Sequence, residues 1–230
     1  THTISINSID LDLKGVSLQS PNQNITPTTI KIDRKHEMIH FIFSELLKPG
    51  SACLHIDFNG KLNSKLKGFY KSTFLGEDGK TQILGTTQFE STDARRAFPC
   101  FDEPEFKAIF SISLKLDKRY KAISNSSIEK ETLNSDGTKL ILFKDTIKMS
   151  TYLVAFIIGS FEETTPVFVN GVPIKIISVK GKKKLTNYAL NCARYFLEYF
   201  NNYYGQNYPG HKLDLVDIPD FASGAMENLG

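Results

Sequence analysis

Glu227 is the carboxylate with the most suggestive surroundings in this chain. It lies in Gly-Ala-Met-Glu-Asn at 224–228, just after an alternating stretch, Leu-Asp-Leu-Val-Asp at 213–217. Alternation of apolar and polar residues predicts a strand. A glycine followed by small and extended residues suits a strand edge that another backbone can approach closely. Such an edge can hold a peptide through main-chain hydrogen bonds, and Glu227 could then bind the α-ammonium group of that peptide.

A second candidate is the motif His-Glu-Met-Ile-His at 36–40. On a helix, two histidines four residues apart can bind zinc while the glutamate between them acts as general base. The residues that follow alternate between apolar and polar, which predicts a strand. A strand would separate His36 and His40 by about 13 Å. A helical stripe through the same residues is the alternative pattern.

The positions at which a third zinc ligand or motif residue would follow hold unsuitable residues. A glutamate eighteen intervening residues beyond His40 would fall at Asn59, and a glycine three beyond it would fall at Phe43. We therefore predict a surface strand with two exposed histidines, His36 and His40, and no metal site in this chain. His2, His55 and His211 are isolated in sequence and are predicted to be surface residues.

The composition is that of an ordinary soluble globular protein. The 230 residues are 40% hydrophobic and 23% charged, with a net charge of +3, which is too small to indicate a nucleic-acid partner. Cys53, Cys100 and Cys192 form neither a disulfide framework nor a C-x-x-C site, which fits a reducing compartment and a cytoplasmic location. The sequence shows no signal-peptide pattern or membrane segment.

Short alternating segments dominate up to about residue 161. Turns are predicted at Asn59-Gly60, at 77–80 and at Asp136-Gly137, and the cleanest half-buried strand covers 110–117. Residues 152–158 form a continuous apolar run, which predicts a strand buried on both faces. Many short strands separated by turns predict a mainly β fold, a sandwich or saddle.

The pattern changes after residue 161. Residues 167–176 predict a hairpin about Asn170-Gly171, and apolar residues from Leu185 to Tyr203 follow a helical stripe. Thr186 is expected to cap the start of this helix and Gly205 its end. The aromatic side chains on the stripe are predicted to lie in the core.

Two blocks of sequence resemble the M1 family of zinc aminopeptidases. Gly-Ala-Met-Glu-Asn at 224–228 is similar to the exopeptidase signature of that family, and Thr-Gln-Phe-Glu-Ser-Thr-Asp-Ala-Arg-Arg-Ala-Phe-Pro-Cys-Phe-Asp-Glu-Pro at 87–104 is similar to its other N-terminal hallmark. Residues 67–70 and 149–156 resemble the puromycin-sensitive branch most closely. The resemblance extends over essentially the whole chain.

This resemblance implies an N-terminal β-sandwich or saddle domain in residues 1–161, without its first strands. Residues 162–230 would then form the first strands and helix of a thermolysin-like α+β catalytic domain. It implies a zinc metallo-aminopeptidase that removes single N-terminal residues from peptides. The Zn²⁺ ligands and the general-base glutamate are expected beyond Gly230, so we expect no catalytic residue in this chain and no activity from it alone.

The resemblance also assigns substrate-binding residues. Glu227 and Glu90 would bind the α-amine of the substrate, and Gln88 would line the pocket for its first side chain. The remaining residues of the signature, which would contact the peptide, are Gly224, Ala225, Met226 and Asn228. Arg95, Arg96, Asp102 and Glu103 are predicted to form structural salt bridges and turns, and Cys100 to be a buried thiol.

Two other hypotheses stay open at this point. The chain could be a natural short form, a non-catalytic β module that binds peptides or partners. It could instead be a small protease that uses His36 and His40. The metal content of the chain separates the second of these from the aminopeptidase hypothesis.

Overall fold

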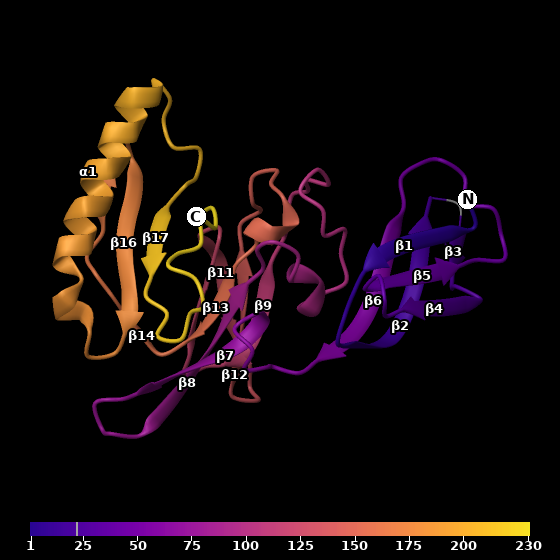
Figure 1. The fold of residues 1–230 in the computed structure, drawn as a ribbon, viewed down its shortest axis with the longest axis horizontal. Helices are drawn as coiled ribbons and strands as arrows, with labels where there is room; N and C mark the ends of the chain where they lie inside the picture. The colour runs from indigo at the N-terminus through magenta and orange to yellow at the C-terminus, as the bar shows by residue number, and fades with distance from the viewer. Residues whose placement is uncertain (22) are drawn as a thin grey trace.

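A computed structural model describes residues 1–21 and 23–230. Strands make up most of the regular structure, and one α-helix, α1 (Asn187–Tyr204), occurs late in the chain. The molecule is elongated, with a small β-sandwich at one end, two further sheets in the middle and α1 at the other end (Figure 1). The prediction of a mainly β fold followed by a strand and helix region is confirmed.

The N-terminal sandwich consists of two three-stranded antiparallel sheets. One has the order β1 (Thr3–Asn7), β5 (Met38–Ile42), β4 (Thr29–Asp33), and the other has the order β3 (Gln23–Ile25), β2 (Leu11–Ser20), β6 (Cys53–Gly60). Apolar side chains from alternate positions meet between the sheets and form a core around Ile6, Leu18, Ile39, Phe41 and Phe43. Residues 8–10 separate β1 from β2, and Asp10 among them has φ 60°.

Two antiparallel sheets form the middle of the molecule. One has the order β10 (Lys121–Ser124), β13 (Phe156–Gly159), β8 (Thr81–Gln88), β7 (Gly68–Leu75), and the other has the order β11 (Ile128–Leu133), β12 (Thr138–Phe143), β9 (Ser113–Asp117). Leu116, Ala122, Ile141 and Phe143 are buried in a common cluster that joins the sheets. The turns predicted at 77–80 and at Asp136-Gly137 connect β7 to β8 and β11 to β12.

Three local predictions in the N-terminal sandwich and the middle sheets were wrong or only partly right. Asn59-Gly60 is not a turn, because both residues end β6, where Gly60 and Asn59 pair with Leu11 and Asp12. The apolar run 152–158 is not one strand. It begins in a 3-10 turn, η2 (Thr151–Leu153), and only its end enters β13. The strand predicted over 110–117 is shorter, since β9 begins at Ser113.

The C-terminal region is a small sheet covered by α1. Strand β16 (Val172–Val179) pairs with β14 (Phe161–Glu163) and β15 (Val167–Val169), and it runs parallel to β17 (Leu213–Val216). The hairpin at Asn170-Gly171 is confirmed, with both residues at positive φ. Gly205 ends α1 in the left-handed conformation, as predicted, whereas the Thr186 hydroxyl does not cap the start of α1 and donates to the Lys183 carbonyl instead.

The aromatic residues of α1 are a clear correction to the sequence analysis. They were expected in the core, but only the face that carries Leu190, Ala193 and Leu197 packs on β15 and β16. The exposed set comprises Tyr188, Tyr195, Phe196, Tyr199, Phe200, Tyr203 and Tyr204. The helix therefore buries a narrower apolar stripe than its sequence offers.

The domain boundary that the sequence analysis placed at residue 161 stays a prediction. Residues on both sides of it share one cluster, in which Leu84 and Ile157 pack with Phe161, Ile177 and Val179. Among the residues that the structure describes, no helix is long and apolar enough to cross a membrane.

Candidate functional site

The segment from Asp217 to Gly230 runs back from β17 across the middle sheets, and its first half is held by β7. The Tyr70 hydroxyl donates to the Asp220 carbonyl at 2.9 Å. The Asp220 carboxylate accepts hydrogen bonds from the amide and the hydroxyl of Thr73, both at 2.8 Å, which lower its pKa. Burial, together with the charge of Asp220, raises the pKa of Tyr70 to about 12, so the phenol stays protonated and keeps donating.

The second half of the segment contains Gly224 to Asn228 and is not a strand. The strand edge that the sequence predicted at 224–228 is therefore not formed. Among the described residues, none of those from 217 to 230 belongs to a strand of a sheet. The last residues of the segment are held instead by separate hydrogen bonds to side chains and to individual backbone groups. The Asn228 amide donates to the Leu153 carbonyl at 3.1 Å, and Gly230 bonds to the Tyr208 hydroxyl and to the Asp214 amide. Gly224 itself is exposed, and a Cβ there would meet no atom within 4 Å.

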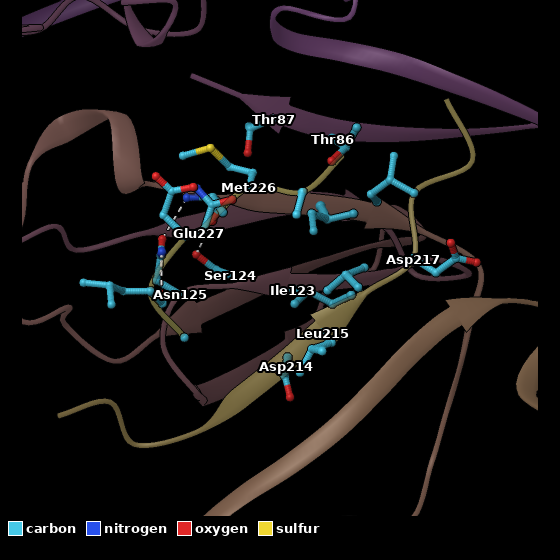
Figure 2. A pocket seen from close by; sticks show the side chains of 18 of the residues that line it. Thr86, Thr87, Ile123, Ser124, Asn125, Asp214, Leu215, Asp217, Met226 and Glu227 are labelled. Carbon is cyan, nitrogen blue, oxygen red and sulfur yellow. Dashed lines mark hydrogen bonds between the residues drawn. The ribbon is translucent and has the colours of Figure 1, made fainter. Parts of the chain in front are cut away.

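A cavity of about 740 Å³ lies between this segment, β17 and the four-stranded middle sheet β10-β13-β8-β7. Its wall is apolar where Ile123, Ile157 and Leu215 face it, and polar where Thr86, Thr87 and Ser124 contribute hydroxyl groups. Met226, Glu227 and Asn125 also line it (Figure 2). The cavity therefore joins residues of β8, β10 and β13 to the segment 224–228.

The structure brings two of the predicted site residues into contact. The Gln88 side-chain nitrogen lies 3.5 Å from the Met226 sulfur, across 138 positions of sequence. Gln88 is only 6% exposed, and its side-chain oxygen is buried without a hydrogen-bond partner among the described residues. Gln88 ends β8, and Met226 precedes Glu227, so the contact joins the two stretches that carry Glu90 and Glu227.

Glu90 and Glu227 are both exposed. Within residues 1–21 and 23–230, neither carboxylate takes part in an ion pair. Glu90 follows Gln88 by two residues, which span at most about 7 Å of extended chain. Glu90 and Glu227 are thus near neighbours in sequence of the two residues in contact, Gln88 and Met226, and neither has an ion-pair partner among the described residues.

Comparison with known proteins agrees with these features. Residues 1–153 match the family description Peptidase M1 N-terminal domain, and residues 188–230 match Peptidase family M1 domain. This chain belongs to peptidase family M1. It is 42% identical to Aminopeptidase 2 of Candida albicans, 40% identical to human Endoplasmic reticulum aminopeptidase 1 and 36% identical to Puromycin-sensitive aminopeptidase of Caenorhabditis elegans.

Each of these three alignments covers 100% of the M1 chain but only 24% or 25% of the relative. The chain therefore spans about a quarter of the length of the curated relatives it matches.

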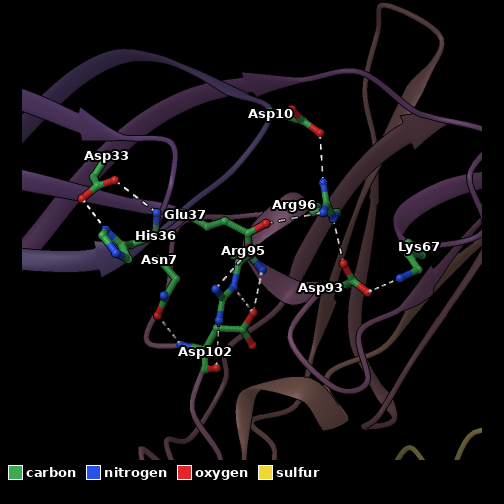
Figure 3. A network of polar contacts seen from close by, with 10 residues as sticks. All are labelled: Asn7, Asp10, Asp33, His36, Glu37, Lys67, Asp93, Arg95, Arg96 and Asp102. Carbon is green, nitrogen blue, oxygen red and sulfur yellow. Dashed lines mark hydrogen bonds and ion pairs between the residues drawn. The ribbon is translucent and has the colours of Figure 1, made fainter.

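The block 87–104 of the M1 chain contains the centre of a network of ion pairs (Figure 3). Arg95 donates to Asp102 through its Nε at 2.9 Å and through its backbone amide at 3.2 Å, and both side chains are nearly buried. Arg96 pairs with Asp93 and Asp10. The prediction of structural salt bridges is confirmed for these residues, and Glu103 lies in the following turn.

Glu37, the middle residue of the motif at 36–40, belongs to this same network. Its carboxylate lies 3.1 Å from Arg95 Nη1 and 3.7 Å from Arg96. The motif is not helical, because His36 and Glu37 form the turn between β4 and β5, and Glu37 has φ 55°. The glutamate therefore joins the N-terminal sandwich to the block 87–104.

The two histidines differ in part from the exposed strand residues that were predicted. His36 is exposed but lies in the turn, where it pairs with Asp33, whereas His40 lies in β5, is partly buried and contacts the Ser5 hydroxyl at 2.7 Å. All three polar residues of the motif thus have other partners. Within the described part of the chain, no group of three or more histidine, cysteine, aspartate or glutamate side chains is placed to hold a metal ion, so these residues do not fit zinc.

Cys100 packs against the cluster around Phe89 and Met149. Burial, together with the nearby charge of Asp102, raises the pKa of its thiol well above the ordinary value. A thiol in this state is a poor nucleophile, in line with the prediction that Cys100 is not one, although the residue is partly rather than fully buried.

Sequence reasoning missed Asp220 and Asn125, which hold the two ends of the segment. Neither belongs to a repeating pattern, and each bonds to a part of the chain that lies far away in sequence. No signal in the sequence alone could have identified their partners.

Proposed function

We propose that this M1 chain supplies the part of a zinc aminopeptidase that recognises the N-terminus of a peptide substrate. Glu227 and Glu90 bind the α-ammonium group, Gln88 and Met226 contact the first side chain, and the backbone of 224–228 lies along the peptide. The observation that supports this proposal is the contact between Gln88 and Met226, because it joins the stretches that carry the two free carboxylates.

The chemical reason for two carboxylates is selectivity for a charged amine. A hydrogen bond to a charged group contributes about 1.5–3 kcal/mol. Two such bonds favour a free ammonium group over an acetylated amine, which carries no charge. The two carboxylates would also hold the α-amine of the substrate at one place. The first peptide bond would then always lie at the same position for cleavage, so that one residue is removed at a time.

The family's chemistry uses zinc to activate the water that attacks the first peptide carbonyl. His36 and Glu37 lie in a turn, His40 lies in β5, and all three have partners within the chain, so these residues do not fit that ion. We therefore derive no catalytic step from these residues. The role proposed for the chain is to bind and orient the substrate.

The experiment compares two ligands that differ in one charge. Alanyl-alanine amide has a free α-ammonium group, and N-acetyl-alanyl-alanine amide lacks it. Two charged hydrogen bonds give at most about 3–6 kcal/mol before binding costs, so we expect dissociation constants in the millimolar range or weaker. Nuclear magnetic resonance shifts of the Met226 methyl group and the Ala225 amide report such weak binding.

We expect saturable shifts with the free amine and almost none with the acetylated peptide. Glu227→Gln and Glu90→Gln should each weaken binding about tenfold, the equivalent of about 1.4 kcal/mol. Glu129→Gln, at an exposed glutamate on β11, is the matched control and should change nothing. Equal binding of both ligands, or equal loss in the Glu129 variant, would contradict the assignment.

A further inference from the structure

Asn125 follows β10 and is 7% exposed. Its side-chain nitrogen donates to the Leu153 carbonyl at 2.8 Å and to the Leu229 carbonyl at 2.7 Å. Its side-chain oxygen accepts the Ala155 amide at 2.8 Å. Both donors and the acceptor of this one amide are therefore used, and they connect three separate parts of the chain.

The Leu153 carbonyl accepts two hydrogen bonds, one from each of two asparagine side chains. It accepts from Asn125 and also from Asn228, whose nitrogen lies at 3.1 Å. The turn that contains Leu153 is thus bonded to the residue after Glu227 and to the side chain that holds Leu229. Asn125 and Glu227 both line the cavity, and both are labelled in Figure 2.

Glu227 has no ion pair of its own among the described residues, so its place depends on its neighbours. Met226 on one side contacts Gln88. On the other side, Asn228 and Leu229 are the residues whose bonds lead to Leu153 and Asn125. If Glu227 binds an ammonium group, hydrogen bonds that fix its backbone raise the affinity. A mobile backbone would lower the fraction of molecules in which the carboxylate is correctly placed.

We propose that Asn125 is a positioning residue that holds Glu227 in place for recognition of the substrate amine. The proposal rests on the function proposed above for Glu227. The side-chain amide of Asn125 is fully hydrogen-bonded within the chain, so we assign it no contact with the ligand. It acts through Leu229 and Leu153, and Asn125 itself lies within residues 1–153, the part of the chain that matches the M1 N-terminal description.

The test uses Asn125→Ala in the full 230-residue chain, with methyl-labelled methionine and amide relaxation. The chain has three methionines, namely Met38, Met149 and Met226. Met226 reports the segment itself, Met149 the adjacent core and Met38 the distant sandwich. We expect the backbone order parameter of Glu227 to fall from about 0.85 to below about 0.6 and the Met226 signal to shift and narrow, while the Met38 signal stays unchanged.

Asn63→Ala is the matched control. Asn63 also donates from one amide to two carbonyls, those of Lys67 and Phe69, and accepts a backbone amide, that of Lys65. Its side-chain bonds reach only residues 65–69, which form the loop before β7 and the first residues of β7, and none of them reaches the segment. The Asn63 variant should therefore leave the Glu227 order parameter unchanged. If Asn125→Ala leaves it unchanged as well, or if both variants lower it equally, the positioning role is wrong.

Asn125→Asp serves if the alanine variant does not fold. It keeps the size of the side chain and the acceptor for Ala155, but it replaces the donors with an oxygen that faces two carbonyls. It should loosen Glu227 in the same way, and an unchanged order parameter in the folded aspartate variant would overturn the proposal.

Ligand binding separates this proposal from the proposed function. If Glu227 loosens so that about one molecule in ten is competent, the dissociation constant of alanyl-alanine amide rises about tenfold. If wild-type chain binds no free-amine ligand while Asn125→Ala still loosens Glu227, the positioning effect stands and the amine-binding function fails. If wild-type chain binds the ligand and Asn125→Ala changes neither affinity nor order, the function stands and the positioning proposal fails.

Discussion

Replacement of Asp102 by alanine should destabilise this M1 chain strongly. Asp102 is 2% exposed, and its carboxylate accepts both the Nε and the backbone amide of Arg95. Removal of one partner from a buried ion pair typically costs about 3–5 kcal/mol, because the other charge is left without compensation. Arg95 keeps Glu37 at 3.1 Å, so we expect the lower end, about 3 kcal/mol.

The assay is urea denaturation followed by circular dichroism, together with a thermal scan. For a chain of this length, about 3 kcal/mol corresponds to a decrease of about 6–12 °C in Tm. Glu37→Gln should cost less, about 1 kcal/mol, because the Glu37 side chain is one-third exposed and solvent screens its interaction. Lys14→Ala removes an ion pair with Asp12 in which both side chains are mostly exposed, and it should cost at most about 1 kcal/mol.

The ranking of the three variants is what tests the reasoning. A loss below about 1 kcal/mol for Asp102→Ala would show that Arg95 finds full compensation elsewhere. A loss for Glu37→Gln as large as that for Asp102→Ala would show that the turn between β4 and β5, and not the buried pair, provides the stability. Either result would refute the stabilising role of burial at Asp102.

Two further outcomes are expected. Burial tends to raise the pKa of Glu163, but hydrogen bonds from Lys121 and Lys175 outweigh it and lower the pKa to about 2. The stability from these pairs is therefore complete above the ordinary value of 4.5 and is lost as the pH falls towards about 2. Glu163→Gln should flatten the stability curve over that range, and an unchanged curve would contradict this. Metal analysis after dialysis should find well below one zinc per chain, and one tightly held zinc that His40→Ala removes would reverse our interpretation of the motif at 36–40.

Hairpins were the most predictable part of the fold. Gly79, Gly137 and Gly171 all have positive φ at turns between paired strands, and glycine reaches that conformation at little cost. Such a signal is local, which is why it can be read from a few residues. Asn59-Gly60 shows the limit of this reading, because pairing with Leu11 and Asp12 fixes the local conformation there.

The candidate site was less predictable, because its contacts connect distant parts of the chain. Glu227, Glu90 and Gln88 were assigned by resemblance to a family, and composition or periodicity could not have brought them together. The structure adds the contact between Gln88 and Met226 and the anchors at Asp220 and Asn125. It also changes the interpretation of Glu37, whose sequence context suggested a general base and whose partners are two arginines.

The helix α1 shows why periodicity predicts an apolar surface without saying what covers it. Tyr195, Tyr199 and Tyr203 stack at intervals of four residues, with ring centroids 6.4 and 5.9 Å apart, and this ladder lies on the exposed side. A helix that is apolar over most of its surface is typical of one covered on more than one side, and exposed apolar patches of this kind mark contact surfaces. Among the described residues, the apolar side chains of α1 that share a core cluster with the sheet are Leu190, Ala193 and Leu197. The attachment of α1 to β15 and β16 therefore depends on these small and aliphatic residues, and the aromatic ladder does not contribute to it.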